Sequence, residues 1–248
     1  MATAPAIKPD QEFEPDWSAL PAPRLQRMAA AGDEILECYR VLRKTGDNVV
    51  GELLRDQGTF YEWQHYPKGD IFDAETNAQY YYHAHPAGTR GEEHGHFHTF
   101  LRPKAMPAGI VPADVPHENR PSGENDALSH LVAISMSAPG YPNRLFTTNR
   151  WVTGEVWYRA ADVCAMLDRF VVDHARPSWP ANRWIGAMIQ LFHPQIEALL
   201  RARDAAVAHW AERFPDRDVY EDRELEVTAE LAISVEDQIR KVRAALQG

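Results

Sequence analysis

The sequence predicts an α+β fold: a central antiparallel sheet that carries a histidine-rich hairpin, with N-terminal helices and a helical C-terminal half. Apolar residues recur at helical spacing near the start of the chain and again after residue 158. Between these regions, short segments rich in aromatic and β-branched residues are bounded by proline and glycine, as is typical of strands and turns. Helices grouped before and after the strands, rather than alternating with them, indicate the α+β class.

The chain has 248 residues, of which 44% are hydrophobic and 25% are charged. This size and composition support one sizeable core. Residues 1–20 are rich in proline and acidic side chains, so we expect a disordered or extended arm. Residues 21–248 are predicted to form a single α+β domain.

The first helix is predicted from about residue 23 to 44. Gly32 interrupts it, and glycine costs about 1 kcal/mol relative to alanine inside a helix. Gly46 ends the helix, and Asp47 or Asn48 can cap a short second one. The apolar stripe of the first helix comprises Leu25, Met28, Ala31, Ile35, Leu36, Tyr39 and Leu42.

Strands are predicted in the middle of the chain. Residues 59–66 have strand-like composition and stop at a turn that begins with Pro67. Residues 79–102 are best interpreted as a hairpin, and the long loop that follows, 103–128, contains five prolines. The next strand pair is predicted at 129–137 and 144–151. In the first of these strands, His130, Val132, Ile134 and Met136 are expected to share one face.

The C-terminal half is predicted to be mainly helical. Pro194 suits the first turn of a helix and therefore marks a helix start. Residues 225–233 alternate loosely and can return to the sheet as a strand. Ser234 with Asp237 resembles an N-cap box that opens a last helix. The other predicted helices cover residues 158–175, 182–192 and 193–214.

Composition and charge exclude several classes of function. The net charge of −10 argues against a nucleic-acid surface, because such surfaces are basic. There is no run of eighteen apolar residues to span a membrane, and the N-terminus lacks the pattern of a secretory signal. Cys38 and Cys164 are the only cysteines, and two isolated thiols suit a reducing cytoplasm. We expect a cytoplasmic protein, and a homo-oligomer is compatible with the sequence.

Histidines are concentrated in the predicted hairpin, where five of the eleven lie between residues 83 and 98. Residues two apart in a strand share a face. His83 and His85 are therefore expected to point the same way, and so are His94, His96 and His98. A register that pairs His85 with His94 also places His83 opposite His96, close enough for two imidazoles to share one ion. A slip of one residue would separate the two sets.

Three interpretations of this cluster are open: solvent-facing histidines, a hydrogen-bonded polar core, or a metal site. Packed imidazoles without an ion repel one another when protonated and leave donors to satisfy, which favours the metal site. Histidine is also the commonest metal ligand. The domain at 21–248 is therefore predicted to bind a metal, with a set of ligands drawn from His83, His85, His96, His98 and Glu93.

Other residues of the hairpin are candidates for catalysis and substrate binding. His94 lies nearest the loop and is a candidate acid/base group. Tyr81, on the histidine face, can donate a hydrogen bond to a bound oxygen ligand. Arg90 and Arg102 can hold an anionic substrate. Sites of three or four imidazoles suit iron, zinc and copper, and they can leave positions open for water, dioxygen or substrate.

The string HAH…EHGHFH resembles the metal strands of the cupin superfamily, where His-x-His and a later glutamate bind iron or manganese inside a β-barrel. Here Glu92 lies seven residues after His85, further than in the cupin pattern, and the second cupin motif is not evident. A longer pattern is similar to an uncharacterised bacterial family, a domain of unknown function, over residues 25–245. That resemblance implies no activity. Its segments are GDNVVGELL, FYEWQHYPKGD, QYYYHAHP, EHGHFHTFLRP, HLVAISM and LFTTNRWVTGE.

The hairpin chemistry predicts a mononuclear metal-dependent enzyme, with a non-haem iron(II) oxygenase acting on a small organic substrate as the first hypothesis. Iron is preferred over zinc or copper because the site is all-nitrogen and has aromatic surroundings. A zinc-dependent hydrolase is the enzymatic alternative. The second hypothesis is a non-catalytic metal- or haem-binding protein, such as a sensor, buffer or chaperone. The third is a structural module whose histidines only hydrogen-bond.

Overall fold

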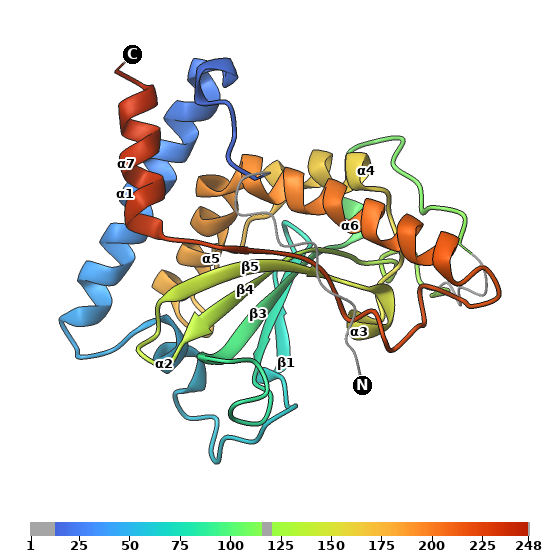
Figure 1. Cartoon of the computed structure of the whole chain (residues 1–248). Coiled ribbons are helices and arrows are strands. Elements are labelled where there is room, and N and C mark those ends of the chain that lie inside the picture. Colours follow the sequence, from blue (N-terminus) through green and yellow to red (C-terminus); the bar gives the residue numbers. More distant parts are fainter. Residues whose placement is uncertain (1–12, 116–120, 248) are drawn as a thin grey trace.

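A six-stranded antiparallel sheet runs through the centre of the molecule, with its strands side by side in chain order (Figure 1). The computed structural model describes residues 13–115 and 121–247. Helices precede the sheet and follow its fifth strand, which confirms the α+β class. The strands are β1 (Tyr66–Phe72), β2 (Ala78–His83), β3 (Glu93–Leu101), β4 (Ser129–Ser137), β5 (Pro142–Thr148) and β6 (Val227–Ala232).

The helices of the described chain pack mainly against one face and one end of this sheet. Three short 3-10 turns accompany them: η1 (Trp17–Ala19), η2 (Pro103–Ala105) and η3 (Leu167–Arg169). The α-helices are α1 (Ala22–Arg43), α2 (Val49–Leu54), α3 (Arg150–Thr153), α4 (Ala160–Met166), α5 (Trp179–Leu191), α6 (His193–Arg213) and α7 (Val235–Ala245).

The predicted N-terminal helices are confirmed, and the structure explains the glycine inside the first one. A Cβ atom at Gly32 would lie 2.8 Å from Cγ1 of Ile239 in α7. Glycine therefore allows α1 and α7 to pack closely side by side (Figure 1). The Asn48 side chain caps α2 by accepting hydrogen bonds from the next turn, as expected.

Residues of the expected N-terminal arm fall into two parts. Residues 1–12 lie outside the described chain. Residues 13–20 are packed onto the domain rather than free: Phe13 is only 4% exposed, and Glu14 accepts a bond from Lys241 Nζ at 2.9 Å. The buried phenylalanine supplies the apolar contact that a proline-rich composition did not indicate.

Three predicted element boundaries are wrong. The first strand was predicted at residues 59–66, but β1 begins at Tyr66. The turn predicted at Pro67 lies inside β1, where the pairing with β2 is irregular between Tyr66 and Ile71. The strand β5 ends at Thr148, because the Asn149 side chain caps α3. The predicted helix at 158–175 is shorter, since α4 and η3 end at Arg169 and an extended segment follows.

The two faces of the sheet differ in chemistry. Tyr80, Tyr82 and Phe97 belong to the main apolar core, and α5 covers them: its Trp184 ring lies 5.8 Å from that of Phe97. The alternate residues of β2 and β3 point to the other face, which carries the histidines. A smaller apolar cluster beside α6 includes Trp157 and Trp210. Within the described chain, none of the helices is both long and apolar enough to cross a membrane.

Candidate metal centre

The hairpin of β2 and β3 places the histidine segments opposite each other, in the predicted register up to His83, whereas the expected pairing of His85 with His94 does not form. His83 pairs with His96, and Tyr81 pairs with His98. Because the register has this parity, all four side chains face away from the core helices. Pairing stops at His83, and His85 continues along the same edge in the connecting loop.

Three imidazoles converge at one point. Each of His83, His85 and His96 offers a ring nitrogen, and these atoms all lie within 4.8 Å of one another. Their ring centroids are 4.4 Å (83–96), 5.2 Å (83–85) and 5.3 Å (85–96) apart. Two imidazoles that bind one ion through bonds of about 2.1 Å, at right or tetrahedral angles, place their centroids roughly 4.5–5.2 Å apart. The three rings are therefore spaced like ligands of a single ion.

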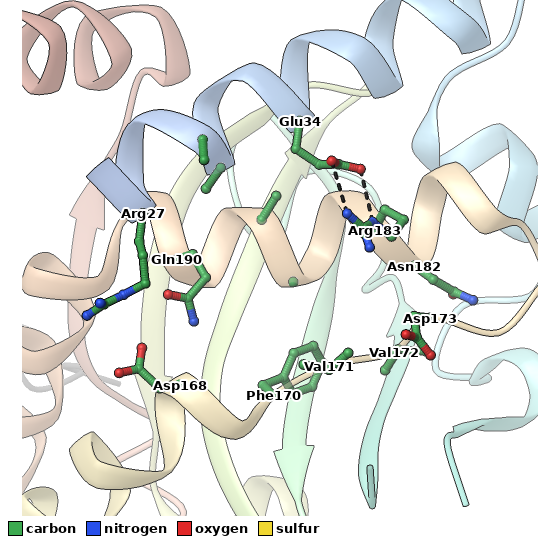
Figure 2. A pocket seen from close by; sticks show the side chains of 14 residues that line it. Arg27, Glu34, Asp168, Phe170, Val171, Val172, Asp173, Asn182, Arg183 and Gln190 are labelled. Atoms are coloured by element: carbon green, nitrogen blue, oxygen red, sulfur yellow. Dashed lines mark hydrogen bonds and ion pairs between the residues drawn. The ribbon is translucent and has the colours of Figure 1, made fainter. Parts of the chain in front are cut away.

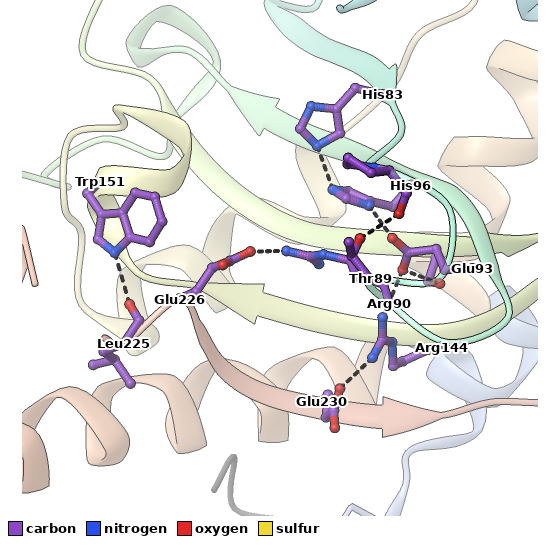
Figure 3. A network of polar contacts seen from close by, with 12 residues as sticks. His83, Thr89, Arg90, Glu93, His96, Arg144, Trp151, Leu225, Glu226 and Glu230 are labelled. Atoms are coloured by element: carbon purple, nitrogen blue, oxygen red, sulfur yellow. Dashed lines mark hydrogen bonds and ion pairs between the residues drawn. The ribbon is translucent and has the colours of Figure 1, made fainter. Parts of the chain in front are cut away.

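Glu93 fixes the orientation of the most buried of these ligands. Its Oε1 accepts a hydrogen bond from His96 Nδ1 at 2.7 Å (Figure 3). With its proton on Nδ1, His96 presents the lone pair of Nε2 to His83 Nε2, which lies 2.7 Å away. Either a proton on His83 or an ion beside both nitrogens must relieve this contact. A carboxylate behind a ligating histidine is a common arrangement at metal sites.

Both oxygens of Glu93 already accept hydrogen bonds, which favours an orienting role over the predicted role as a ligand. Its Oε2 accepts from Ser135 Oγ at 2.6 Å and from Arg144 at 2.8 Å (Figure 3). Burial raises the pKa of Glu93, but the hydrogen bonds from His96, Ser135 and Arg144 outweigh it and hold that pKa well below the ordinary value. Glu93 is therefore a permanent anion behind His96.

His98 lies one step further into the protein. Its ring centroid is 4.8 Å from that of His96 and 5.3 Å from that of His83. His98 Nδ1 is 3.0 Å from His130 Nε2, whereas His98 Nε2 is buried and has no hydrogen-bond partner among the described residues. The ring nitrogens of His98 lie outside the group of three that come within 4.8 Å of one another, so the structure does not bring this predicted ligand to the same point. An unpaired buried nitrogen is nevertheless costly, which makes Nε2 a candidate proton acceptor.

His130 reaches this face through a bulge, which corrects its predicted alignment with Val132 and Ile134. Thr99 pairs with Val132, but the next residue, Phe100, pairs with His130. The extra residue on β4 reverses the side to which His130 points. It therefore joins the histidine cluster instead of the apolar core.

His94 is turned away from the cluster, contrary to the prediction that it shares a face with His96. An irregularity in the β3–β4 pairing between Glu93 and Gly95 changes the alternation at this point. His94 Nδ1 instead lies 2.6 Å from the Tyr82 hydroxyl, and its ring stacks near Phe60. The predicted acid/base residue is thus on the opposite face from the three converging nitrogens.

The remaining predicted residues divide between the site and its surroundings. Tyr81 lies on the histidine face, with its ring 5.2 Å from that of His98. Arg90 lies beside the site: it pairs with Glu226, and its guanidinium is 5.4 Å from the centre of the Phe146 ring (Figure 3). Arg102 follows the far end of β3, where it binds Gln79 and Asp126 outside the site.

Two residues of the cluster were missed from the sequence. His65 stacks on Tyr81 with ring centroids 3.6 Å apart, and its Nδ1 contacts Asp70 at 3.1 Å. Trp63 lies 4.2 Å from the His85 ring and is 60% exposed. Both precede β1 in a loop, and no spacing in the sequence connects them to the hairpin. Their position depends on how β1 pairs with β2.

The imidazoles are held in the neutral form that metal binding requires. Burial and neighbouring imidazoles lower the pKa of His83 to about 2. Burial, with Arg90 and His96, lowers the pKa of His85 to about 4. Both side chains are only partly buried, so solvent reaches this side of the cluster, whereas His96 is 1% exposed.

Comparison with known proteins identifies a family but no function. No curated protein matches the chain, and no solved structure matches it. A family described as a domain of unknown function, DUF6969, matches residues 29–233. Because that match covers well over half of the chain and includes the whole histidine hairpin, the protein belongs to this family of domains of unknown function.

Proposed function

We propose that the protein binds one divalent metal ion through His83, His85 and His96. The observation that carries this proposal is the convergence of three neutral ring nitrogens within 4.8 Å, one of them on a histidine held by a buried carboxylate. Neutral imidazoles and an orienting carboxylate are what a mononuclear metal site needs.

The same geometry favours a catalytic site over a closed structural one. Three protein nitrogens leave coordination positions for other ligands, and the partly exposed His83 and His85 lie on the side that solvent reaches. We propose a cytoplasmic non-haem iron(II) oxygenase that acts on a small organic substrate. Iron(II) would supply the redox chemistry for using dioxygen, and the chain would supply the three imidazoles, the carboxylate behind them and an aromatic surround that includes Tyr81 and Phe146. Zinc and copper suit the same donors.

A second candidate function rests on His98. Its buried Nε2 is unpaired but lies outside the group of three converging nitrogens, so His98 would have to move towards the ion to complete a four-imidazole set. Such a set would leave a tetrahedral ion without an open position. The protein would then be a non-catalytic metal-binding protein, such as a sensor or buffer. His98→Phe separates the two candidates, because it removes the fourth nitrogen and leaves the three converging ones.

The enzymatic proposal is tested by dioxygen consumption after anaerobic loading with iron(II). We expect uptake that depends on iron and on a compound from a panel of small organic acids and phenols. It should be lost in His83→Ala and retained in His94→Ala, a histidine of the same hairpin that faces away. Iron binding without uptake for any compound would contradict the oxygenase and support the second candidate.

A further inference from the structure

A cavity of about 610 Å³ lies between α1, α5 and the extended segment at 168–173 (Figure 2). Its volume falls in the range of small-molecule sites. It is separate from the histidine cluster, because α5 packs on the opposite face of the sheet through Trp184 and Phe97. None of the residues of the candidate metal centre lines it.

The helices leave this space open because the side chains that face it are small. The cavity is lined by Ala30 and Ala31 of α1 and by Gly186 and Ala187 of α5. A Cβ atom added to Gly186 would meet only the Phe170 carbonyl oxygen, at 3.9 Å. Packing therefore does not require glycine here, although glycine costs about 1 kcal/mol relative to alanine inside a helix. Gly186 differs in this respect from Gly32, where an added Cβ would collide with α7.

The wall opposite α5 is apolar. Phe170 and Val172 lie in this wall with their side chains almost fully covered at 2% exposed, and Val171 between them is 41% exposed and offers the accessible apolar surface. An apolar body placed here would contact Val171 and the exposed Ala30 of α1. Burial of such a body is favourable in proportion to its area.

Most charges at the rim are already paired within the protein. Arg183 holds Glu34 through two hydrogen bonds of 3.0 and 3.1 Å (Figure 2). Arg24 holds Asp168 in the same way, at 3.0 and 3.2 Å. Asp173 also lines the cavity, near Arg183 and Asn182 in Figure 2, so the end beside the Glu34–Arg183 pair carries an additional negative charge.

Arg27 is the exception among the cavity arginines. It is exposed, and none of the ion pairs within residues 13–115 and 121–247 includes it. Figure 2 shows Arg27 beside Gln190 and Asp168 at one end of the cavity, away from the Glu34–Arg183 pair. Because Arg24 already neutralises Asp168, this end carries an excess positive charge and an amide. An anionic group would be held there.

We propose that this cavity binds an amphipathic organic anion. Its carboxylate or sulfonate would pair with Arg27 next to Gln190, and its apolar body would lie on Val171 and Ala30. The proposal is independent of the metal centre, which lies on the other face of the sheet. It gives this family member a second, separate ligand site.

The test is a fluorescence titration of the folded full-length protein with 8-anilinonaphthalene-1-sulfonate, with decanoate as a competitor. We expect saturable binding that decanoate displaces. Arg27→Gln should weaken binding about tenfold, the size of one charge-assisted contact. Gly186→Met should weaken it at least as much, because an unbranched side chain would fill the cavity. Arg40→Gln, an exposed arginine of the same helix outside the cavity, should leave binding unchanged.

Near-UV circular dichroism of each variant separates lost binding from lost folding. If Gly186→Met does not fold, Ala30→Leu narrows the cavity from an exposed position of α1 and should weaken binding in the same way. Absence of saturable binding to the folded wild type would overturn the proposal. So would equal affinities in wild type, Arg27→Gln and the cavity-filling variant.

Discussion

Both oxygens of Glu93 are occupied, one by His96 at 2.7 Å and the other by Ser135 and Arg144 at 2.6 and 2.8 Å. We therefore expect Glu93 to act on a bound metal through His96. Its charge favours a proton on Nδ1 of that ring and strengthens the lone pair on Nε2. At the residue scale, this buried anion is the feature that favours a metal site over a group of histidines that only hydrogen-bond.

Glu93→Gln tests this role, because it keeps the shape of the side chain and removes its charge. We expect metal affinity to fall about 10- to 100-fold, the usual effect of removing an orienting carboxylate. Competition with a chromogenic chelator measures the change. Glu230→Gln is the matched control, since Glu230 binds the other end of Arg144 and does not touch His96. Equal affinities in wild type and Glu93→Gln would show that Glu93 is not coupled to a metal.

Glu155 gives a prediction for the dependence of stability on pH. It is buried, its Oε2 accepts from the His130 backbone N–H at 2.6 Å, and its Oε1 has no partner among the described residues. Burial raises its pKa from 4.5 to about 8, although Arg203 opposes the shift. Between these two values the unfolded chain loses the proton while the folded chain keeps it. The protonated Glu155 carboxyl group therefore makes its full contribution to the free energy of unfolding below pH 4.5. This contribution decreases as pH rises and is lost above about pH 8.

Glu155→Gln should remove that slope, because glutamine accepts the same backbone hydrogen bond and does not ionise. At pH 8.5 the variant should be more stable than wild type, by an amount on the order of a few kcal/mol. Urea unfolding of metal-free protein from pH 5 to 9 measures the difference. Parallel pH profiles for the two proteins would contradict the buried, protonated state of Glu155.

At the element scale, the sequence predicted most helices and the existence of the hairpin, but it left the parity of the strand register open. Apolar spacing predicted α1 and α6. The every-second-residue spacing of the histidines in each segment predicted two strands, and the structure pairs them with His83 opposite His96. The predicted side-chain directions of His94 and His130 were wrong, and both residues lie at interruptions of the β3–β4 pairing. These irregularities depend on contacts between strands that no local pattern records.

One of the two interruptions left a signal in the sequence. Gly95 lies between two histidines, and glycine inside a strand often marks a bulge or a close approach. A Cβ atom there would lie 2.5 Å from both the Tyr82 hydroxyl and the His83 carbonyl oxygen. Reading Gly95 in this way would have allowed His94 to turn from the cluster. The bulge that turns His130 leaves no comparable residue.

The two helix-interior glycines should respond to alanine in opposite ways. Gly32→Ala should destabilise the protein by about 1–3 kcal/mol, because its Cβ would overlap Ile239 of α7. Gly186→Ala should stabilise it by up to about 1 kcal/mol, since its Cβ has room. Urea unfolding of both variants checks the pair. Stabilisation by both substitutions would contradict the close packing of α1 on α7.

At the scale of the whole molecule, the sheet separates two kinds of chemistry. One face is covered by α1 and α5, which provide the apolar core and the cavity next to Arg27. The other carries the histidines, with loops that bring His65 and Trp63 to them. The sequence located the hairpin, but this convergence depends on tertiary structure.

A bound ion should therefore stabilise the whole fold. A ligand that binds only the folded state raises the free energy of unfolding with the logarithm of its concentration. At a metal concentration one hundred times Kd, the increase should be about 2.7 kcal/mol. Thermal unfolding with and without added zinc or iron(II) measures this. The increase in Tm should be absent in His83→Ala. An equal increase in His83→Ala would place the binding elsewhere.

The most direct measurement of the central claim is the metal content of untagged protein, determined by elemental analysis beside His83→Ala and His94→Ala. The structure predicts about one equivalent of iron, zinc or copper in wild type and in His94→Ala, and loss of the metal in a folded His83→Ala. No metal in any of the three proteins, even after anaerobic reconstitution with iron(II), would contradict it. The three imidazoles would then be a hydrogen-bonded part of the fold.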